Sequence, residues 1–245
     1  MCILIVLRGF HGDFPIVVAG NRDEQVDRLA SPPGLWSGQR SRVLSPRDRR
    51  AGGTWMAVDH RGWFAGITNI MGEPPVPEAP SRGHLPHLAL DHVDLDEAIR
   101  SVSRMVAGHS AFQLVLCDGQ RTVVLRHVAA RLEVIEWTSP VLVVTNEHAP
   151  GALLLRGLAT ATRPLLEVEA RLDALQVLMR DRGGDGHHAF CKRGDVYGTV
   201  SSSLIAVPAG DPRRLIWRYA PGPPDITAYR NYGNLGQRLL PDEAN

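Results

Sequence analysis

Lysine is almost absent from this chain. Of its 27 basic residues, Lys192 is the single lysine and the other 26 are arginines. Lysine-dependent chemistry, such as a Schiff base or a phosphate-binding loop, therefore has one candidate residue. Lys192 lacks both the glycine-rich run before it and the Ser or Thr after it that a phosphate-binding loop requires. The sequence argues against both chemistries.

Cysteine and long apolar runs are also scarce. The cysteines are Cys2, Cys117 and Cys191, and their spacing matches neither a disulfide framework nor a zinc site. The apolar start, residues 1–7, is too short for a signal peptide, and no later run approaches the ~20 residues of a membrane span. We therefore expect a cytoplasmic protein without a membrane span.

The charges are balanced and mixed along the chain. The formal net charge is +1, and arginines stand beside acids, as in Arg22-Asp23 and Arg47-Asp48. No basic stripe of the kind that neutralises a phosphate backbone is visible. Nucleic acid is not expected as a partner, whereas a small-molecule substrate or ligand is. The sequence gives no indication of the oligomeric state.

Several motifs that carry common chemistries are missing. The pairs His84/His87 and His187-His188 have no carboxylate or cysteine at metal-ligand spacing, so they are interpreted as solvated histidines. No metal site and no cofactor is predicted, and without Cys-x-x-Cys-His any haem would be bound noncovalently. The absence of Gly-x-Ser-x-Gly argues against a serine hydrolase of the α/β type.

The remaining pattern is that of a folded α+β protein. Of the 245 residues 44% are apolar and 22% charged, which is typical of a globular chain. Helical spacing of apolar residues predicts helices over 81–91, 94–107 and 164–180, with Asp94 as an N-cap. Short apolar or β-branched runs between turn residues predict strands over 2–7, 14–19, 54–59, 63–69, 112–117, 122–127, 132–136, 141–145, 195–207 and 213–219.

Three segments are predicted to lack regular structure. They are the Pro/Gly/Arg-rich stretch 31–53, the loop 71–80 with its four prolines, and the tail from Pro221. The order of the remaining elements suggests antiparallel sheets with helices segregated outside them. We expect one domain over residues 1–245.

Cys2 is a candidate nucleophile because of its position. The cell ordinarily removes a methionine that precedes a small residue, which would leave a thiol and a free α-amine on Cys2. A thiol with a pKa near ~8.5 is partly ionised at neutral pH, and an α-amine with a pKa near ~7.7–8 is matched to proton transfer. The alternative interpretation is a small buried residue that begins a strand.

Four polar motifs follow Cys2 in a fixed order. Asn21-Arg22-Asp23-Glu24 stands where a buried hairpin would turn, and Gly52-Gly53-Thr54-Trp55, Ile67-Thr68-Asn69 and Ser81-Arg82-Gly83 come after it. This ordered set resembles the NRDE family, also called the transport and Golgi organisation protein 2 family. The likeness continues through Trp36, Arg47-Asp48, Val144-Thr145-Asn146 and residues 197–202.

The resemblance implies a fold and a set of site residues. The fold would be the four-layer αββα sandwich of Ntn hydrolases, similar to choloylglycine hydrolases and penicillin V acylases. Cys2 would be the nucleophile, Asp23 would hold the α-amine, and Arg22 would polarise the thiol. Amide groups of Asn69 and Asn146 would donate to an oxyanion. The residues expected at the substrate are Asn21, Glu24, Trp55 and Arg82, with Glu24 also bracing the turn.

Each of these assignments has a plainer alternative. The run Arg22-Asp23-Glu24 is also what a solvated turn looks like, and Asn69 and Asn146 are also typical of strand ends. At one position the chain departs from the family pattern, because Val200 stands where many relatives have arginine before the late Ser-Ser pair. Either the ligand is less anionic at that point or the position is structural.

Two functions from different classes follow from the resemblance. The first is an amidohydrolase or acyltransferase that forms a thioester on Cys2. The second is a non-enzymatic protein that binds and carries haem or acyl-lipid groups, because family members resemble haem chaperones. A shared fold does not decide between them.

Overall fold

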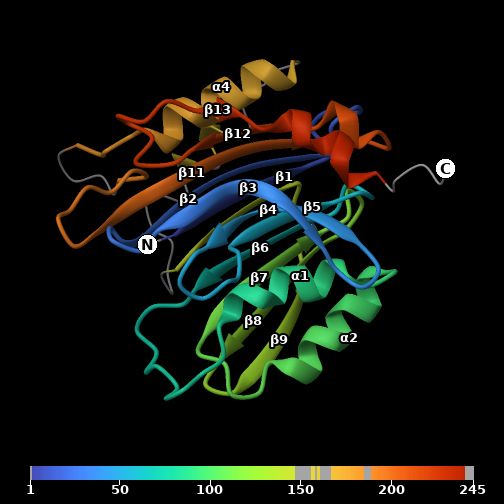
Figure 1. The fold of residues 1–245 in the computed structure, drawn as a ribbon, viewed down its shortest axis with the longest axis vertical. Helices are drawn as coiled ribbons and strands as arrows, with labels where there is room; N and C mark the ends of the chain where they lie inside the picture. The colour runs from blue at the N-terminus through green and yellow to red at the C-terminus, as the bar shows by residue number, and fades with distance from the viewer. Residues whose placement is uncertain (1, 147–155, 158, 161–166, 185–188, 241–245) are drawn as a thin grey trace.

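The fold is a sandwich of two antiparallel β-sheets with helices on both outer faces (Figure 1). The structure is a computed structural model that describes residues 2–146, 156–157, 159–160, 167–184 and 189–240. In the described part of the chain, no helix has the length and apolar character needed to cross a bilayer. The expected α+β class and four-layer αββα arrangement are confirmed.

The first sheet joins both ends of the chain. Among the described residues it has six strands in the order β10-β1-β2-β11-β12-β13, all paired antiparallel. The central pair, β2 and β11, aligns Ile16 with Val207 and Gln25 with Tyr197. The strands are β1 (Ile3–Arg8), β2 (Ile16–Gln25), β10 (Val141–Thr145), β11 (Tyr197–Val207), β12 (Ile216–Ala220) and β13 (Arg230–Asn231).

The second sheet is a continuous meander. Its strands in the described part of the chain number seven and follow one another in sequence order. Each pairs antiparallel with the next. The connections are short except between β6 and β7, where the chain forms η1, α1 and α2. The strands are β3 (Ala30–Ser37), β4 (Arg42–Asp48), β5 (Met56–Asp59), β6 (Phe64–Asn69), β7 (Phe112–Cys117), β8 (Thr122–Val128) and β9 (Arg131–Glu136).

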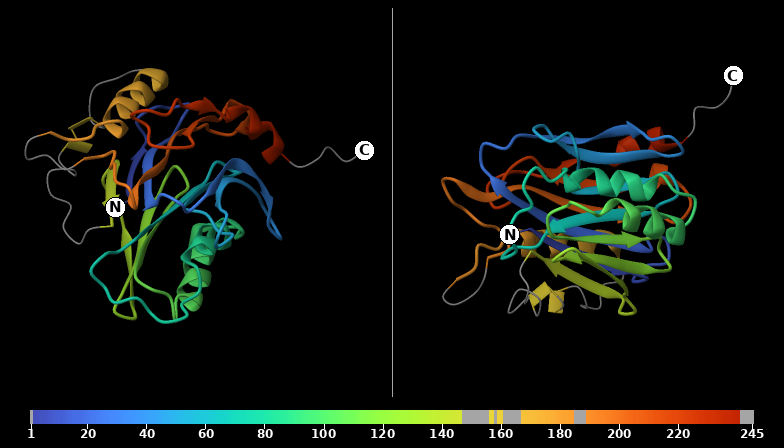
Figure 2. Two further views of the ribbon diagram at one scale, coloured as in Figure 1. Left: turned by 60° about the vertical axis from the view of Figure 1, so that its left-hand side comes forward. Right: turned by 90° about the horizontal axis from the view of Figure 1, so that it is seen from below.

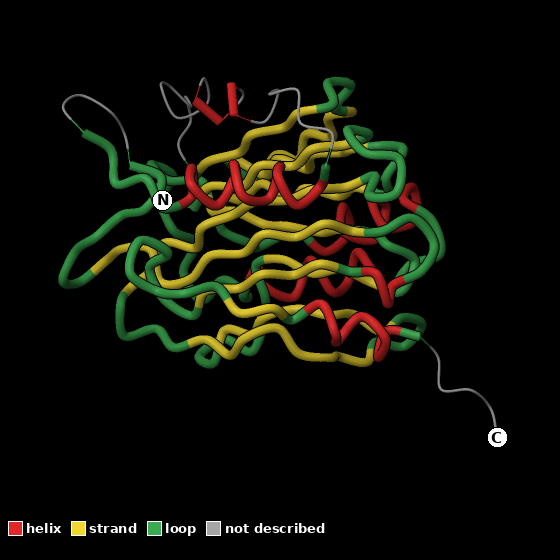
Figure 3. The backbone as a smooth tube through the Cα atoms, turned by 90° about the horizontal axis from the view of Figure 1, so that it is seen from above, coloured by secondary structure: helices red, strands yellow, loops and turns green. Residues whose placement is uncertain are grey.

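The helices form the outer layers, as Figures 2 and 3 show. α1 (Leu85–Leu90) and α2 (Leu95–Met105) cover the second sheet, and α4 (Val168–Met179) covers the first. Asp94 caps α2 as predicted, since its carboxylate accepts a hydrogen bond from the Glu97 amide at 2.7 Å. The remaining elements are the 3₁₀ turns η1 (Arg82–His84), η2 (Pro212–Arg214) and η3 (Gly233–Leu239).

Three apolar layers lie between these four layers. Side chains alternate along β1, so that Ile3 and Ile5 pack toward α4 while Leu4 and Val6 pack toward the second sheet. A third cluster lies between the second sheet and α1 and α2, around Leu114. A strand buried on both faces is apolar throughout, which explains the unbroken run at the start of the chain.

Some sequence predictions about secondary structure are wrong. The stretch 31–53 holds two strands, β3 and β4, although its prolines and glycines suggested a loop; β3 lies at the sheet edge, where proline is tolerated. The tail from Pro221 contains the short β13 and η3. In addition, β2 continues to Gln25, so residues 21–24 belong to a strand and not to a turn.

The other predicted elements are found near their expected bounds. Strands over 112–117 and 141–145 coincide with β7 and β10. The third helix is confirmed from Val168 onward, while residues 164–166 of its predicted range lie outside the described residues. The helix predicted over 81–91 consists of η1 followed by α1, with Pro86 in the first turn of α1.

Candidate active site

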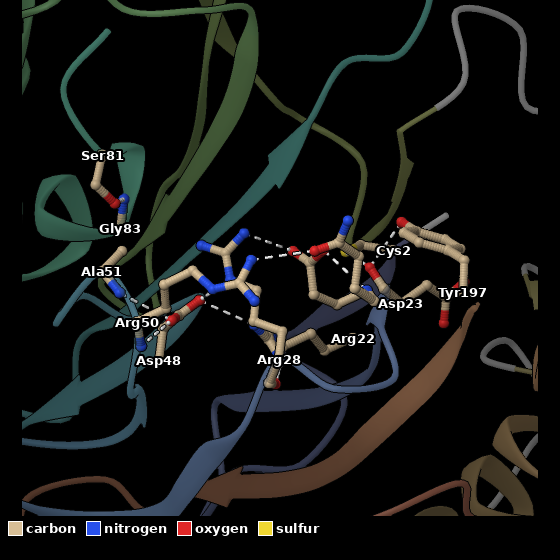
Figure 4. Close-up of polar contacts among 12 residues, drawn as sticks. Cys2, Arg22, Asp23, Arg28, Asp48, Arg50, Ala51, Ser81, Gly83 and Tyr197 are labelled. Carbon is tan, nitrogen blue, oxygen red and sulfur yellow. Dashed lines mark hydrogen bonds and ion pairs between the residues drawn. The ribbon is translucent and has the colours of Figure 1, made fainter. Parts of the chain in front are cut away.

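Cys2 lies directly before β1 and lines a cavity of about 270 Å³. It is half-buried, and the cavity is open to solvent on one side. Figure 4 shows Cys2, Asp23 and Tyr197 at one end of the contacts in this region and Asp48 at the other. The walls are formed by Cys2, Arg22, Asp23, Glu24, Arg28, Asp48, Ala51, Gly53, Thr54, Trp55, Ile67, Asn69, Ala79, Pro80, Ser81, Arg82, Gly83 and Ser110.

The structure brings most of the predicted site residues to this cavity and leaves two outside its walls. The predicted residues that line it are Cys2, Arg22, Asp23, Glu24, Trp55, Asn69 and Arg82. Asn21 and Asn146 are buried and are not part of these walls. The cavity thus unites motifs that are as much as 80 residues apart in sequence.

The thiol of Cys2 is held against the neighbouring strand. Its Sγ donates a weak hydrogen bond to the backbone oxygen of Asp23 at 3.7 Å. Burial raises the pKa of the thiol, and the charge of Asp23 adds to this, while the more distant Arg22 lowers the pKa by less. The electrostatic influence of Arg22 therefore has the expected sign but does not outweigh burial.

Asp23 is fixed by strand β11. Its Oδ1 accepts a hydrogen bond from the hydroxyl of Thr199 at 2.7 Å, and its backbone oxygen accepts one from the Tyr197 hydroxyl at 2.8 Å. The Thr199 hydroxyl in turn accepts from the Lys192 amide at 2.8 Å. Burial raises the pKa of the Asp23 carboxyl above its ordinary value, and the Thr199 hydrogen bond opposes this.

Arg22 points toward the second sheet and joins an ion-pair network. Its guanidinium lies 2.9 Å from Asp48 Oδ2 and 4.6 Å from the centre of the Trp55 ring. Arg28 shares the same Asp48 oxygen at 2.8 Å and contacts Glu24 at 3.2 Å. Burial raises the pKa of Asp48, but the backbone amides and the two arginines together lower it by more. The pKa of Asp48 is therefore below its ordinary value.

The predicted asparagines have three different environments. Asn21 Nδ2 donates to the carbonyls of Met179 and Phe190, at 2.9 and 2.8 Å, so this side chain holds α4 against the sheet. Asn146 lies opposite Cys2 across the β1–β10 ladder, and its backbone N–H donates to the Cys2 carbonyl at 3.3 Å. Asn69, at the end of β6, is exposed and lines the cavity.

Two glycines bring Arg82 to the cavity. The Thr54 amide donates to the Gly83 carbonyl at 2.8 Å, and a methyl group at Gly53 would lie 2.5 Å from the Gly83 carbonyl carbon. Only glycine permits this backbone contact between the β4–β5 loop and η1. The motifs Gly52-Gly53-Thr54-Trp55 and Ser81-Arg82-Gly83 are therefore two halves of one wall.

Sequence reasoning missed several residues that shape the site. Arg28, Thr199 and Asp48 had no assigned role, although Asp48 and Thr199 belong to motifs that carried the resemblance. Their signal was indirect, because Thr199 lies opposite Asp23 in β11, Asp48 ends β4 of the other sheet and Arg28 follows β2. Val200 is the extra residue of a bulge between the pairs Thr199–Asp23 and Ser201–Arg22, and it is half-buried.

Comparisons with known sequences place the chain in one family. The family model described as Transport and Golgi organisation 2 matches residues 1–153. The Transport and Golgi organization 2 homolog of Mus musculus is 29% identical over 109 residues, which are 43% of this chain and 39% of the mouse protein. The corresponding protein of Homo sapiens matches with the same identity and coverage, so the match spans about two fifths of either relative.

Comparisons with solved structures show the fold. Penicillin V acylase from Agrobacterium tumefaciens superposes with a TM-score of 0.58 at 13% identity, covering 90% of this chain and 83% of that one. The N-acylethanolamine-hydrolyzing acid amidase ortholog of Caenorhabditis elegans gives 0.58 at 11% identity, covering 85% and 93%. At these identities the likeness concerns the fold alone.

The matched region, residues 1–153, holds the first four motifs and most of the cavity wall. It covers more than half of the chain, and the Ntn-hydrolase fold of the structural neighbours agrees with the observed sandwich. The chain belongs to the transport and Golgi organisation 2 family.

Proposed function

We propose that this protein is an N-terminal-nucleophile amidohydrolase, or an acyltransferase of the same mechanism, in which Cys2 forms a thioester with a small amide substrate. The observation that carries the proposal is the placement of Cys2. Its thiol lies at the end of a polar cavity beside Arg22 and Asp23, and the cavity is large enough for a small molecule. The fold is shared with proteins named as an acylase and an acid amidase.

The chemistry begins once Met1 has been removed and Cys2 carries the α-amine. The amine takes the thiol proton, and the sulfur attacks the amide carbon to form a C–S bond and a tetrahedral oxyanion. The C–N bond then breaks, and the α-ammonium gives its proton to the leaving amine. Water attacks the thioester in hydrolysis, or a second amine or alcohol does so in acyl transfer, and the thiol is regenerated.

Asp23 and Arg22 serve this cycle from opposite faces of β2. Asp23, held by the Thr199 hydroxyl, is placed to orient the α-amine, as the resemblance implied. Arg22, held by Asp48 and Trp55, supplies a fixed positive charge that favours the thiolate. Because burial raises the pKa of Cys2, proton transfer to the amine matters more than spontaneous ionisation of the thiol.

The oxyanion is assigned to amide donors near Cys2. Asn69 lines the cavity, and Asn146 faces Cys2 across the ladder. In enzymes of known mechanism, one oxyanion donor lowers the activation barrier by about 3 kcal/mol. Glu24 and Trp55 are assigned to substrate contact, and Asn21 to the support of α4 instead of the substrate contact first expected for it.

The charged walls favour this function over haem carriage. A porphyrin face is apolar and needs an apolar slot, whereas this cavity is lined by three arginines and three acids. The family name refers to transport, so a haem titration followed by the porphyrin absorption band is the comparison to make. Saturable binding at micromolar haem, together with no turnover, would favour the carrier.

The test combines intact mass, labelling and turnover. We expect the purified protein to lack Met1, a thiol-directed electrophile to label Cys2, and turnover of small amides to vanish in Cys2→Ala. Cys117→Ala is the matched control, because Cys117 is buried between the sheets and does not line the cavity. Full turnover by Cys2→Ala would refute the proposal, and retained Met1 would refute the role of the α-amine.

A further inference from the structure

We infer that the cavity selects substrates bearing a carboxylate close to the scissile amide, and that Arg82 is the residue that binds this carboxylate. The substrate class rests on the proposed function, whereas the attraction of anions to Arg82 does not. The argument uses the charge balance of the cavity, the unused donors of Arg82 and the size of the space.

The charges near the Arg22 end of the cavity are matched within the protein. Arg22 and Arg28 share Asp48 at 2.9 and 2.8 Å, and Arg28 also contacts Glu24 at 3.2 Å. Two cations therefore face two anions in one connected network (Figure 4). Arg22 and Arg28 hold the wall together, and the carboxylates that they pair with offset most of the positive charge that a ligand would meet.

Arg82 is different, because no carboxylate of the described residues lies within ion-pairing distance of it. Its Nη1 donates to the Ala111 carbonyl at 2.7 Å. A guanidinium has five N–H donors in a planar fork, and none of the others forms a hydrogen bond within the described part of the chain. The guanidinium nitrogens of Arg82 that form no hydrogen bond are not fully buried. These unused donors are therefore accessible to solvent in the cavity.

The surroundings strengthen the demand for an anion. Burial lowers the pKa of Arg82 and the positive charge of Arg28 lowers it further, and the smaller opposing effects of Cys2 and Glu24 do not offset them. A carboxylate between the two arginines relieves both effects, and its planar oxygens fit the guanidinium fork in a bidentate pair. A neutral amide or an alkyl chain offers no such compensation.

Arg82 is also held in place before any ligand arrives. Ser81 Oγ accepts the Gly83 amide at 3.3 Å, and the Gly53–Gly83 backbone contact fixes η1 against the β4–β5 loop. The Nη1 bond to Ala111 anchors the side chain to the start of β7. A preorganised guanidinium loses little side-chain freedom when it binds.

The size of the cavity limits the distance between the carboxylate and the amide. Its volume of about 270 Å³ corresponds to about nine water molecules. Cys2 and Arg82 line the same space, so the carbonyl at Cys2 and the carboxylate at Arg82 belong to neighbouring parts of one ligand, even if the rest of it extends through the open side. The class that fits is an amide with a carboxylate a few bonds from its carbonyl, on either the acyl or the amine side.

The experiment compares alkylation of Cys2 by iodoacetate and by iodoacetamide, two reagents of similar size that differ by one negative charge. The rate at Cys2 is followed by peptide mass spectrometry. We expect Arg82→Met to lower the ratio of the iodoacetate rate to the iodoacetamide rate by about fivefold, and Arg82→Lys to restore most of it. High salt is expected to reduce the ratio in the wild-type protein.

Arg50→Met is the matched control, because it removes one arginine charge from an exposed side chain outside the cavity. A ratio that falls equally in Arg50→Met and Arg82→Met would overturn the inference, as would an unchanged ratio in Arg82→Met. Thermal melting of each variant identifies loss of fold, and Arg82→Lys keeps the test decisive if Arg82→Met unfolds.

Turnover assays with three substrates then show on which side of the amide the carboxylate is recognised. Succinyl anilide carries it on the acyl side and N-acetylglycine on the amine side, and acetanilide carries none. We expect Arg82→Met to raise KM for one charged substrate and to leave neutral acetanilide unaffected. Equal turnover of the charged and neutral substrates would overturn the substrate class but not the proposed amidohydrolase activity. Absence of turnover with all three substrates, together with the expected alkylation ratios, would overturn the amidohydrolase activity alone.

Discussion

At the scale of single residues, the site depends on which charges are satisfied by the protein itself. Asp48 accepts from Arg22 and Arg28 through Oδ2, and from the amides of Arg50 and Ala51 through Oδ1. The carboxylate therefore closes the turn after β4 with one oxygen and fixes two arginines with the other. A buried ion pair of this kind is costly to break from one side, because the partner remains buried.

Replacing Asp48 by Asn tests this directly. Asn keeps an acceptor for the two turn amides but removes the charge that faces Arg22, whose side chain is 5% exposed. We expect Asp48→Asn to lower the free energy of unfolding by about 3 kcal/mol in urea titrations. Glu24→Gln, in a more exposed pair with Arg28, is expected to cost under about 1 kcal/mol. Equal costs for the two variants would contradict this account.

Thr199 is the second residue whose role is local and testable. Its hydroxyl donates to Asp23 and accepts from the Lys192 amide, so Thr199→Val removes both hydrogen bonds within a buried site. We expect a loss of about 2 kcal/mol in unfolding free energy and a fall in turnover per folded molecule. Thr199→Ser keeps the hydroxyl and is expected to retain most of both. If Val and Ser behave alike, the hydroxyl does not position Asp23.

At the scale of elements, α1 carries a half-buried imidazole against the second sheet. His87 Nε2 lies 2.8 Å from Ser45 Oγ of β4, and the His87 ring lies 5.5 Å from that of Trp36 on β3. Burial, with a smaller contribution from Arg47, lowers the pKa of His87 to about 4. The helix is therefore packed around a neutral histidine.

The pH dependence of stability follows from this shift. Between about pH 6.5, the ordinary pKa of histidine, and about pH 4, the unfolded chain binds a proton at His87 that the folded protein does not. The folded state is thus destabilised as the pH falls through this window, by about 2 kcal/mol between pH 7 and pH 5. Urea titrations at both values are expected to show a smaller loss in His87→Gln than in the wild-type protein, because His109 and His127, whose pKa values burial also lowers, still contribute in the variant.

Ser45→Ala separates burial of the ring from its hydrogen bond. This variant removes the hydroxyl and keeps the imidazole, so its stability is expected to fall with acid as in the wild-type protein. An identical pH response in the wild-type protein and His87→Gln would show that His87 does not carry the effect.

At the scale of the whole molecule, the two sheets share one core. The first sheet takes its strands from both ends of the chain, and its inner face packs on the second sheet through Leu4, Ile205 and Trp217. Strands that are distant in sequence, such as β2 and β11, are thereby neighbours in one sheet. We propose that residues 1–245 form one domain that unfolds as a unit.

Cooperative unfolding is measurable with two probes. Trp217 reports on the first sheet and Trp36 on the second, while far-ultraviolet circular dichroism reports on both. We expect the fluorescence of a variant that keeps only Trp217, that of a variant that keeps only Trp36, and the dichroism to change at the same urea concentration. Separate midpoints would mean that the sheets unfold independently.

The sequence by itself determined the layers and the position of the candidate nucleophile. The apolar runs located most strands because strands buried on both faces leave an uninterrupted pattern. Local chemistry also located the Asp94 cap. The ordered motifs then indicated the family, and most motif residues expected at the site do line the cavity.

Only the tertiary structure decided which way each side chain of residues 21–24 points. A turn would have exposed all four, but β2 continues through them, so successive side chains point to opposite faces. Asn21 therefore holds α4, while Arg22 reaches Asp48 in the other sheet. The pairing of Arg22 with Asp48, and the lack of a carboxylate partner for Arg82 among the described residues, arise from contacts between sheets and loops. No local sequence pattern encodes contacts of that range.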